Sequence, residues 1–532
     1  TAFVGAQSGT GTAHGISALS FAGDASVYNG GDVYAIGSDA AYGLEAAAQY
    51  GDAGVANAGL VVTSAGYSVG ASLNARDDAV ALNVGQIYAY GDNAFGVKAT
   101  AGDDIYVGNG GLIYANGDSL GAGVYAIAYG DATVHNATGG EIGFYSYFGT
   151  GIGVLAYSPD GTVLVDNDGT ISGYAYGQSI GIFGLSDSGS VELSNSGEIS
   201  TISGGSQAIG IFGRADYGSV SVTNSGDITV SDNGINGFYG YSAYGVLARG
   251  DYVDVANSGN IDADGIYYAT GIAARSYYGT HVTTTGGNID AIAIGGGTGI
   301  DAQSLFGDVT VDNASSIDAV GIVFGARGIQ AYSIYGDANV DNTGDIYAGS
   351  LYGNAIGIYA YSALGDAGVH NDGDVTAISY YGLADGIFAS GSDVEVANSG
   401  AIETYGYTWT AGIEAEGANS TSVVNSGDIS VNTSGFYSYV STYDYSTYEG
   451  AKGYTDEVTS YTRGGDAIGI YATGGEGGVS VDNSGDITMD GGYSITGIQV
   501  ASAGDVLIVN SGDITGGSAG ATYSKYTGSS YD

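Results

Sequence analysis

The sequence predicts an all-β protein: a single parallel β-helix, or β-solenoid, of about 17 coils with roughly 28 residues in each coil. Two observations lead to this prediction. A motif of the form V-x-N-x-G-x-[IV] recurs along nearly the whole chain, and a second motif, G-[IV]-x-A-x-[S/G], alternates strictly with it. Repetition at such a period is typical of a solenoid, in which stacked repeats build a core that no single repeat has.

The first motif places an asparagine at the same position of each repeat. We expect these asparagines to stack at one corner of successive coils, where each side-chain amide hydrogen-bonds the next one. The glycine two positions later supplies the backbone freedom for the bend. In the repeat "VTTTGGNI", Thr285 takes the place of the asparagine. The predicted ladder includes Asn195, Asn224, Asn257, Asn313, Asn342, Asn371, Asn398, Asn425, Asn483 and Asn510.

Within each repeat, alternation of apolar and polar residues marks three short strands. They are V-x-V before the asparagine, I-x-A after it, and the stretch G-I-x-A-x-S. The inward positions hold Val, Ile, Ala and Leu, so we expect Ile199, Ile228 and Ile261 to point into the core. The crossover rule for parallel strands predicts a right-handed coil.

One repeat is much longer than the others, because Asn425 and Asn483 are far apart and only one second motif lies between them. The chain therefore divides into coils at 1–429, an insertion rich in Tyr and Ser at 430–464, and final coils with a polar tail at 465–532. Long loops on a rigid scaffold commonly carry binding, and tyrosine with serine gives broad, adaptable contact. The alternative is a disordered excursion. The candidate binding residues of the insertion are Tyr437, Tyr439, Tyr443, Tyr445 and Tyr448.

The charge balance is strongly acidic, with 9 Lys+Arg against 56 Asp+Glu and a formal net charge of −47. This balance argues against nucleic-acid binding, which needs a cationic surface. No apolar stretch is long enough to span a membrane as a helix. The chain has no cysteine, so it forms no disulfide.

Three of the few basic residues share one outward position in three successive coils: Arg214, Arg249 and Arg275. Two interpretations remain open. The arginines either pair with the nearby Asp216 and Asp251, or form a small binding site for an anionic sugar or a carboxylate of a partner.

The position before the isoleucine of the first motif is acidic in about half of the repeats. Acids in neighbouring coils would stand about 5 Å apart, which is unfavourable for like charges. Three remedies for this repulsion remain open: exposure to solvent, a raised pKa of the carboxyl groups, or a bridging cation such as Ca²⁺. Calcium is the one metal that the sequence suggests, with Asp227, Asp345 and Asp374 as its candidate ligands.

We expect no catalytic residues and no other cofactor. His135 and His370 share one position of the repeat but lie many coils apart, and no zinc-type spacing, nucleophile elbow or P-loop occurs. Some β-helices cleave polysaccharides with carboxylates on one strand face, and stacking could bring two acids together here as well. A polysaccharide-active enzyme therefore stays open as the least favoured alternative.

The iterated pattern "VxNSGDIxA…GIxAxS" resembles the passenger regions of bacterial type V autotransporters and related β-helical surface adhesins, over nearly the whole chain. This resemblance implies an extracellular protein of the bacterial cell surface. We expect a secreted, non-enzymatic structural protein whose copies form a filament or matrix through end and lateral contacts. The alternative is an adhesin that binds a glycan or protein of a host or cell surface.

Overall fold

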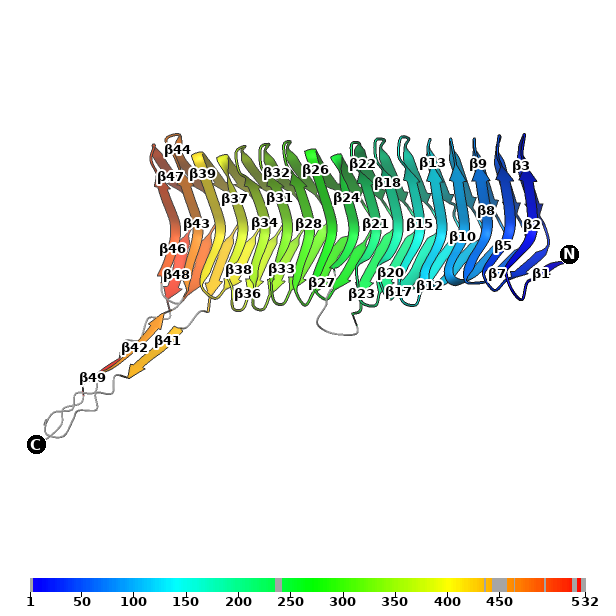
Figure 1. Ribbon diagram of the computed structural model, residues 1–532. Helices are drawn as coiled ribbons and strands as arrows, with labels where there is room; N and C mark the ends of the chain where they lie inside the picture. The colour runs from blue at the N-terminus through cyan, green and yellow to red at the C-terminus, as the bar shows by residue number, and fades with distance from the viewer. Residues whose placement is uncertain are drawn as a thin grey trace, which may run out of the picture. The chain divides into compact units, whose positions relative to one another are not determined.

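The computed structural model describes residues 3–234, 242–434, 437–442, 457–463, 465–491, 494–518 and 524–527. Apart from 437–442, 457–463 and 524–527, these residues form a parallel β-solenoid of about 17 turns with ~28 residues per turn (Figure 1). The described residues contain strands and no helix, so none of them forms a helix that could cross a membrane. The predicted fold class and repeat length are confirmed.

The chain divides into two compact units, Thr1–Ala319 with Ile329–Gly344, and Val320–Gly328 with Asp345–Asp532. The first unit contains β1 (Phe3–Gln7), β2 (Thr12–Ser20), β3 (Ala25–Asn29), β4 (Asp32–Ile36), β5 (Ala40–Ala48), β6 (Ala53–Asn57), β7 (Leu60–Ser64), β8 (Tyr67–Ala75), β9 (Ala79–Asn83), β10 (Gln86–Ala101), β11 (Ile105–Asn109), β12 (Leu112–Ala128), β13 (Ala132–Asn136), β14 (Glu141–Ser146), β15 (Thr150–Ser158), β16 (Val163–Asn167), β17 (Thr170–Ala175), β18 (Ser179–Ser186), β19 (Val191–Asn195), β20 (Glu198–Ser203), β21 (Ala208–Ala215), β22 (Ser219–Asn224), β23 (Asp227–Asp232), β24 (Ser242–Asn257), β25 (Ile261–Gly265), β26 (Tyr268–Thr284), β27 (Asn288–Ala293), β28 (Gly296–Ser304), β29 (Val309–Asn313) and β32 (Ala338–Asn342).

The strands β30 (Ser316–Gly321) and β31 (Gly325–Ser333) lie where the two units divide the chain. The second unit contains β33 (Ile346–Ser350), β34 (Asn354–Ser362), β35 (Ala367–Asn371), β36 (Val375–Ser379), β37 (Ala384–Asn398), β38 (Ile402–Gly406), β39 (Trp409–Asn425), β40 (Ile429–Thr433), β41 (Tyr437–Thr442), β42 (Glu457–Arg463), β43 (Asp466–Gly474), β44 (Gly478–Asn483), β45 (Ile487–Gly491), β46 (Ser494–Ser502), β47 (Val506–Asn510), β48 (Ile514–Ser518) and β49 (Ser524–Thr527).

Each coil contributes three strands that pair in parallel with the same strands of the neighbouring coils. In the middle of the first unit, β20 pairs with β17 and β23, β21 with β18 and β24, and β22 with β19 and β24. The inward positions are apolar as expected, and Ile199, Ile228 and Ile261 are buried. The core is therefore a stack of Val, Ile and Ala layers that runs through the interior of each unit.

The glycine of the second motif is required by close packing. An added Cβ at Gly210 would lie 2.4 Å from Cγ2 of Ile228 and 2.6 Å from the carbonyl oxygen of Gly245. A methyl group at that place would overlap both atoms, since carbon contacts need roughly 3.5–4.0 Å. The isoleucine of the first motif thus fills the space that the glycine of the second motif leaves.

The predicted asparagine ladder is present in both units. Nδ2 of Asn195 donates to Oδ1 of Asn224 at 2.7 Å, and Nδ2 of Asn224 donates to Oδ1 of Asn257 at 2.7 Å. The same nitrogen of Asn224 also donates to the carbonyl oxygen of Gly226. In the second unit the ladder runs through Asn371, Asn398, Asn425, Asn483 and Asn510.

The prediction that Thr285 occupies an asparagine position is wrong, because the register places Thr284 between Asn257 and Asn313. The hydroxyl of Thr284 donates to Oδ1 of Asn313. The bend of this repeat is one residue longer than the bend of the motif. Gly287 accommodates the extra residue by adopting a φ of 76°. A positive φ of this size favours glycine.

The insertion begins later than the predicted boundary at residue 430. Strand β40 continues to Thr433 and pairs with β38 and β45 of the solenoid. Strands β41 and β42 then pair with each other in antiparallel fashion, and β49 of the polar tail adds to β42. Of the candidate tyrosines, Tyr437 and Tyr439 lie on β41. Tyr443, Tyr445 and Tyr448 lie outside the described residues.

Candidate functional site

The three arginines form a column on the outside of the first unit. Arg214 on β21 is in register with Arg249 on β24, and Arg249 is in register with Arg275 on β26. Each arginine lies next to an inward alanine or glycine of its strand, so the alternation of the strand turns the arginine side chain outward. The predicted outward column is therefore present.

Two of the arginines have carboxylate partners. Nε of Arg214 lies 2.7 Å from Oδ1 of Asp216, as expected. Nη2 of Arg275 lies 2.9 Å from Oδ2 of Asp301, which belongs to the next coil. Asp251, the other predicted partner, lines the same surface, but among the described residues it forms no ion pair with an arginine.

Arg249, the middle arginine, has no ion-pair partner among the described residues. Its pKa is lowered, first by partial burial of the guanidinium, then by the positive charge of Arg275; the field of Tyr244 raises the pKa and that of Arg214 lowers it. The guanidinium nevertheless stays charged, because the ordinary pKa of an arginine lies far above neutral pH. Within the part of the chain that the structure describes, Arg249 is thus a cation that forms no ion pair, in a protein of net charge −47.

The arginine column is the floor of a surface pocket of 730 Å³, which we call the arginine pocket. This volume is in the range of small-molecule sites. Nε of Arg275 is buried without a hydrogen-bond partner. The pocket is lined by Arg214, Ala215, Asp216, Tyr217, Arg249, Gly250, Asp251, Arg275, Ser276, Tyr277 and Tyr278.

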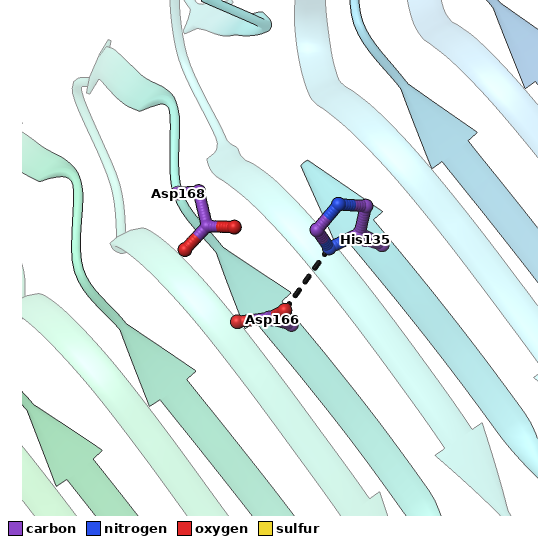
Figure 2. A group of neighbouring side chains, drawn as sticks. All are labelled: His135, Asp166 and Asp168. Atoms are coloured by element: carbon purple, nitrogen blue, oxygen red, sulfur yellow. Dashed lines mark hydrogen bonds and ion pairs between the residues drawn. The ribbon is translucent and has the colours of Figure 1, made fainter. Parts of the chain in front are cut away.

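A second cluster brings a histidine together with two aspartates (Figure 2). Nδ1 of His135 on β13 lies 3.0 Å from Oδ2 of Asp166 on β16, and Asp168 follows in the bend after β16. The ligand atoms of these three residues lie within 4.8 Å of one another. Imidazole with carboxylate is a donor set that suits transition metals. However, Ser194 and Ser196 donate hydrogen bonds to Asp166 and Asp168, so both carboxylates already have protein partners.

The candidate calcium ligands accept hydrogen bonds from the neighbouring coil. Oδ1 of Asp345 accepts a hydrogen bond from the amide of Asp374 at 3.2 Å, and Oδ1 of Asp374 accepts one from the amide of Ala401 at 2.9 Å. Asp227 accepts a hydrogen bond from the side chain of Asn260. These carboxylates thus accept N–H groups of the next coil, which offsets the repulsion between stacked acids; a bridging cation at these residues stays a prediction.

The first unit contains a further row of stacked aspartates that was not predicted from the sequence. Each carboxylate of this row accepts the backbone N–H of the next coil at distances of 2.7–3.1 Å. Its spacing equals the repeat, which is the sequence signal that could have revealed it. The row consists of Asp24, Asp52, Asp78, Asp104 and Asp131.

Stacking also brings two carboxylates together in the second unit. Asp385 on β37 is buried, and its pKa is raised well above its ordinary value, first by burial and then by the charge of Glu414 on β39. Burial also raises the pKa of Glu414, which accepts a hydrogen bond from Nε1 of Trp409 at 3.1 Å. Raised pKa values are a mark of catalytic acids, but Asp385 is only 4% exposed, so a substrate has little access to it.

Comparison with known protein families, curated proteins and solved structures found no match for this chain. The case for a binding site in the arginine pocket therefore depends on the geometry and chemistry of its lining residues.

Proposed function

We propose that this chain is a secreted, non-enzymatic β-solenoid of a bacterial surface that binds an anionic ligand in the arginine pocket. The observation that carries this proposal is the unpaired guanidinium of Arg249 between two arginines that have carboxylate partners. The chain has 9 basic residues, and three of them meet in this pocket. An arginine binds a carboxylate or phosphate with two parallel hydrogen bonds, which makes such a pocket selective for oxyanions.

The overall charge of the chain acts against this binding at long range. A net charge of −47 repels any polyanion, and salt at 0.15 M screens this repulsion beyond about 8 Å. The hydrogen bonds inside the pocket are short-range and are screened much less. We therefore expect binding to be weak at low ionic strength and stronger as salt rises toward physiological values, opposite to the usual salt dependence of a cationic site.

The test compares wild type with Arg249→Gln on immobilised carboxylated, sulfated and neutral glycans and on acidic peptides. We expect wild type to bind at least one anionic probe, and Arg249→Gln to bind it at least tenfold more weakly. Arg76→Gln is the matched control, because Arg76 lies over the ring of Tyr50 elsewhere in the same unit. Equal binding by Arg249→Gln, or no binding of any anion by wild type, would contradict the proposal.

A second candidate function is self-assembly into a filament or matrix. It is favoured by the coil of β46–β48, where Val506, Ile508 and Ile514 occupy inward positions yet are 50%, 46% and 42% exposed. The matching residues of the preceding coil, Val479, Val481 and Ile487, are buried. A coil of a second copy stacked on this edge would bury the apolar side chains and extend the strand ladder.

Light scattering over a series of NaCl and Ca²⁺ concentrations tests this candidate. Charge repulsion between copies opposes assembly, so we expect larger particles as either salt rises. An Ile508→Asp variant should reduce assembly, because it places a charge on the apolar edge. A particle size that stays that of a monomer under every condition would exclude self-assembly, while leaving the binding proposal untouched.

A further inference from the structure

A second pocket adjoins the arginine pocket, and Tyr278 lines both of them. This second pocket has a volume of 440 Å³. Its lining differs in charge, since it has no arginine and contains Asp254 and Asp308 together with His281. Tyr252 forms the other aromatic wall, and its ring centroid lies 5.8 Å from that of Tyr278. The remaining lining is Ser219, Val220, Ser221, Val253, Gly279, Thr280 and Thr310.

The two pockets favour opposite kinds of group. In the arginine pocket, the unpaired guanidinium of Arg249 attracts an oxyanion. In the second pocket, the carboxylates of Asp254 and Asp308 repel a second anion and accept hydrogen bonds from hydroxyl groups. His281 lies between Asp254 and Asp312, at 3.3 Å and 3.1 Å. One histidine cannot neutralise these two carboxylates and Asp308 as well, so the second pocket stays negatively charged.

We infer that the ligand is an acidic polysaccharide in which carboxylated and uncharged sugar units alternate. The carboxylated unit lies over Arg249, between the exposed rings of Tyr217 and Tyr277. The next unit crosses Tyr278 and places its hydroxyl groups against Asp254, Asp308 and the threonines of the second pocket. This inference rests on the proposed anion-binding function and names the ligand class of the same site.

Sugars fit the linings better than an acidic peptide does. The second pocket offers carboxylate and hydroxyl oxygens and tyrosine rings, which match the hydroxyl groups and the C–H faces of a sugar ring. Tyrosines give a large contact area at a low cost in conformational entropy. A peptide rich in Asp or Glu would put a second carboxylate beside Asp254, where like charges repel. The same repulsion acts on a polymer in which every sugar is charged.

The experiment uses the full chain and four probes of similar length at one fixed ionic strength. The probes are hyaluronan, in which uronate and uncharged sugars alternate, polygalacturonate, in which every sugar is charged, neutral dextran, and poly-glutamate. Calorimetry or biolayer interferometry gives the dissociation constants. We expect hyaluronan to bind at least tenfold more tightly than polygalacturonate and poly-glutamate, with no binding of dextran. Tyr278→Ala should weaken the binding of hyaluronan.

The charge of the second pocket provides a test by gain of binding. Asp254→Asn and the pair Asp254→Asn with Asp308→Asn should raise the affinity for polygalacturonate several-fold relative to that for hyaluronan, because the amide removes the repulsion of the anion but still accepts a hydrogen bond from a hydroxyl group. Asp254 is exposed, so the single variant is expected to fold even if the pair does not. A purely structural role of these residues would not change the ratio of the two affinities.

The outcomes separate this inference from the proposed function. If polygalacturonate or poly-glutamate binds as tightly as hyaluronan, and Arg249→Gln abolishes that binding, the pocket binds anions but the alternating glycan is excluded. The alternating glycan is likewise excluded if the aspartate variants leave the affinity ratio unchanged. If no probe shows binding that depends on Arg249, both the inference and the proposed function are wrong.

Discussion

Nδ2 of Asn425 donates a hydrogen bond of 2.7 Å to Oδ1 of Asn483, although 58 residues of chain separate the two asparagines. Their neighbours are equally regular, since β39 pairs with β44 and β40 with β45 in unbroken register. The long repeat therefore leaves the ladder and the strand pairing of the solenoid as they are in every other coil. The inserted residues are an addition to one corner of the coil rather than a part of its core.

This regularity predicts that the insertion can be removed. In the preceding coil, two residues join Gly406 to Trp409, and these positions are in register with Thr433 and Asp466. Replacing residues 434–465 by Tyr-Thr should leave the solenoid intact and raise its stability by up to about 2 kcal/mol, because a shorter loop costs less entropy to close. Thermal unfolding followed by circular dichroism checks this. A clear fall in the midpoint would show that the insertion supports the coils.

The asparagine ladder should be costly to interrupt. Asn224→Ala removes the acceptor of Asn195 and the donor to Asn257, and both of these groups are buried. Each unsatisfied buried polar group costs about 1–3 kcal/mol, so for the two groups we expect a loss of about 2–6 kcal/mol. The control is Asn260→Ala, whose hydrogen bonds are exposed, with an expected loss below about 1 kcal/mol. Equal losses for the two variants would show that the ladder adds no stability of its own.

The glycine of the second motif should tolerate no side chain. Gly210→Ala places a methyl group against Ile228 and the carbonyl oxygen of Gly245, so we expect a loss of about 1–3 kcal/mol from overpacking. Gly30→Ala is the matched control, because nothing lies within 4 Å of its added Cβ. Denaturant unfolding of both variants gives the comparison. A Gly210→Ala protein as stable as Gly30→Ala would mean that neighbouring coils separate more easily than the packing indicates.

The sequence predicted those features that repeat in every coil. The asparagines, the inward isoleucines and the arginine column follow from the period, because equal positions in successive coils must lie side by side. Features that depend on a local change of register were missed. One extra residue before Asn288 moved Thr284 into the ladder in place of Thr285, and only the geometry of the strand decides which threonine is inward.

Pairs made between different side-chain types were missed for another reason. The repeat relates His135 to His370, its equivalent many coils away, whereas the partner of His135 is Asp166, one coil away in the same position. Arg275 likewise pairs with Asp301 of the next coil, whereas Arg214 pairs with Asp216 of its own coil, so one position of the repeat has two kinds of partner. The pair of His135 with Asp166 follows from the repeat once each position is matched with the next coil, whereas Arg275 is in register with Gln303 and reaches Asp301 two positions away.

Asp385 makes the stability of the second unit depend on pH. Its folded-state pKa is well above the ordinary value of 3.8, because burial disfavours the charged carboxylate and Glu414 adds repulsion. A group with a raised folded-state pKa contributes its full stability below the unfolded-state pKa and loses it as the pH rises through the folded-state pKa. The ionised side chain of Asp385 therefore destabilises the folded state at high pH, whereas the protonated side chain does not do so at low pH. A hydrogen bond from the backbone of Ala411 lowers the pKa in turn, while Oδ1 of Asp385 is buried with no hydrogen-bond partner among the described residues.

We therefore predict that Asp385→Asn stabilises the protein at neutral and higher pH, because the neutral amide avoids the burial of a charge; each unit by which the folded-state pKa is raised corresponds to about 1.4 kcal/mol. The gain should shrink as the pH falls and vanish near pH 3.8, where the wild-type carboxyl group is neutral in the folded state as well. Unfolding midpoints measured between pH 3 and pH 9 give this dependence.

Asp393→Asn on the same strand is a control of opposite sign, because hydrogen bonds from Ser420 and Asn419 lower the pKa of Asp393. That variant should lose stability at neutral pH and recover it in acid. A gain for Asp385→Asn that does not change with pH would show that the side chain is neutral throughout this range, and that packing alone explains the effect.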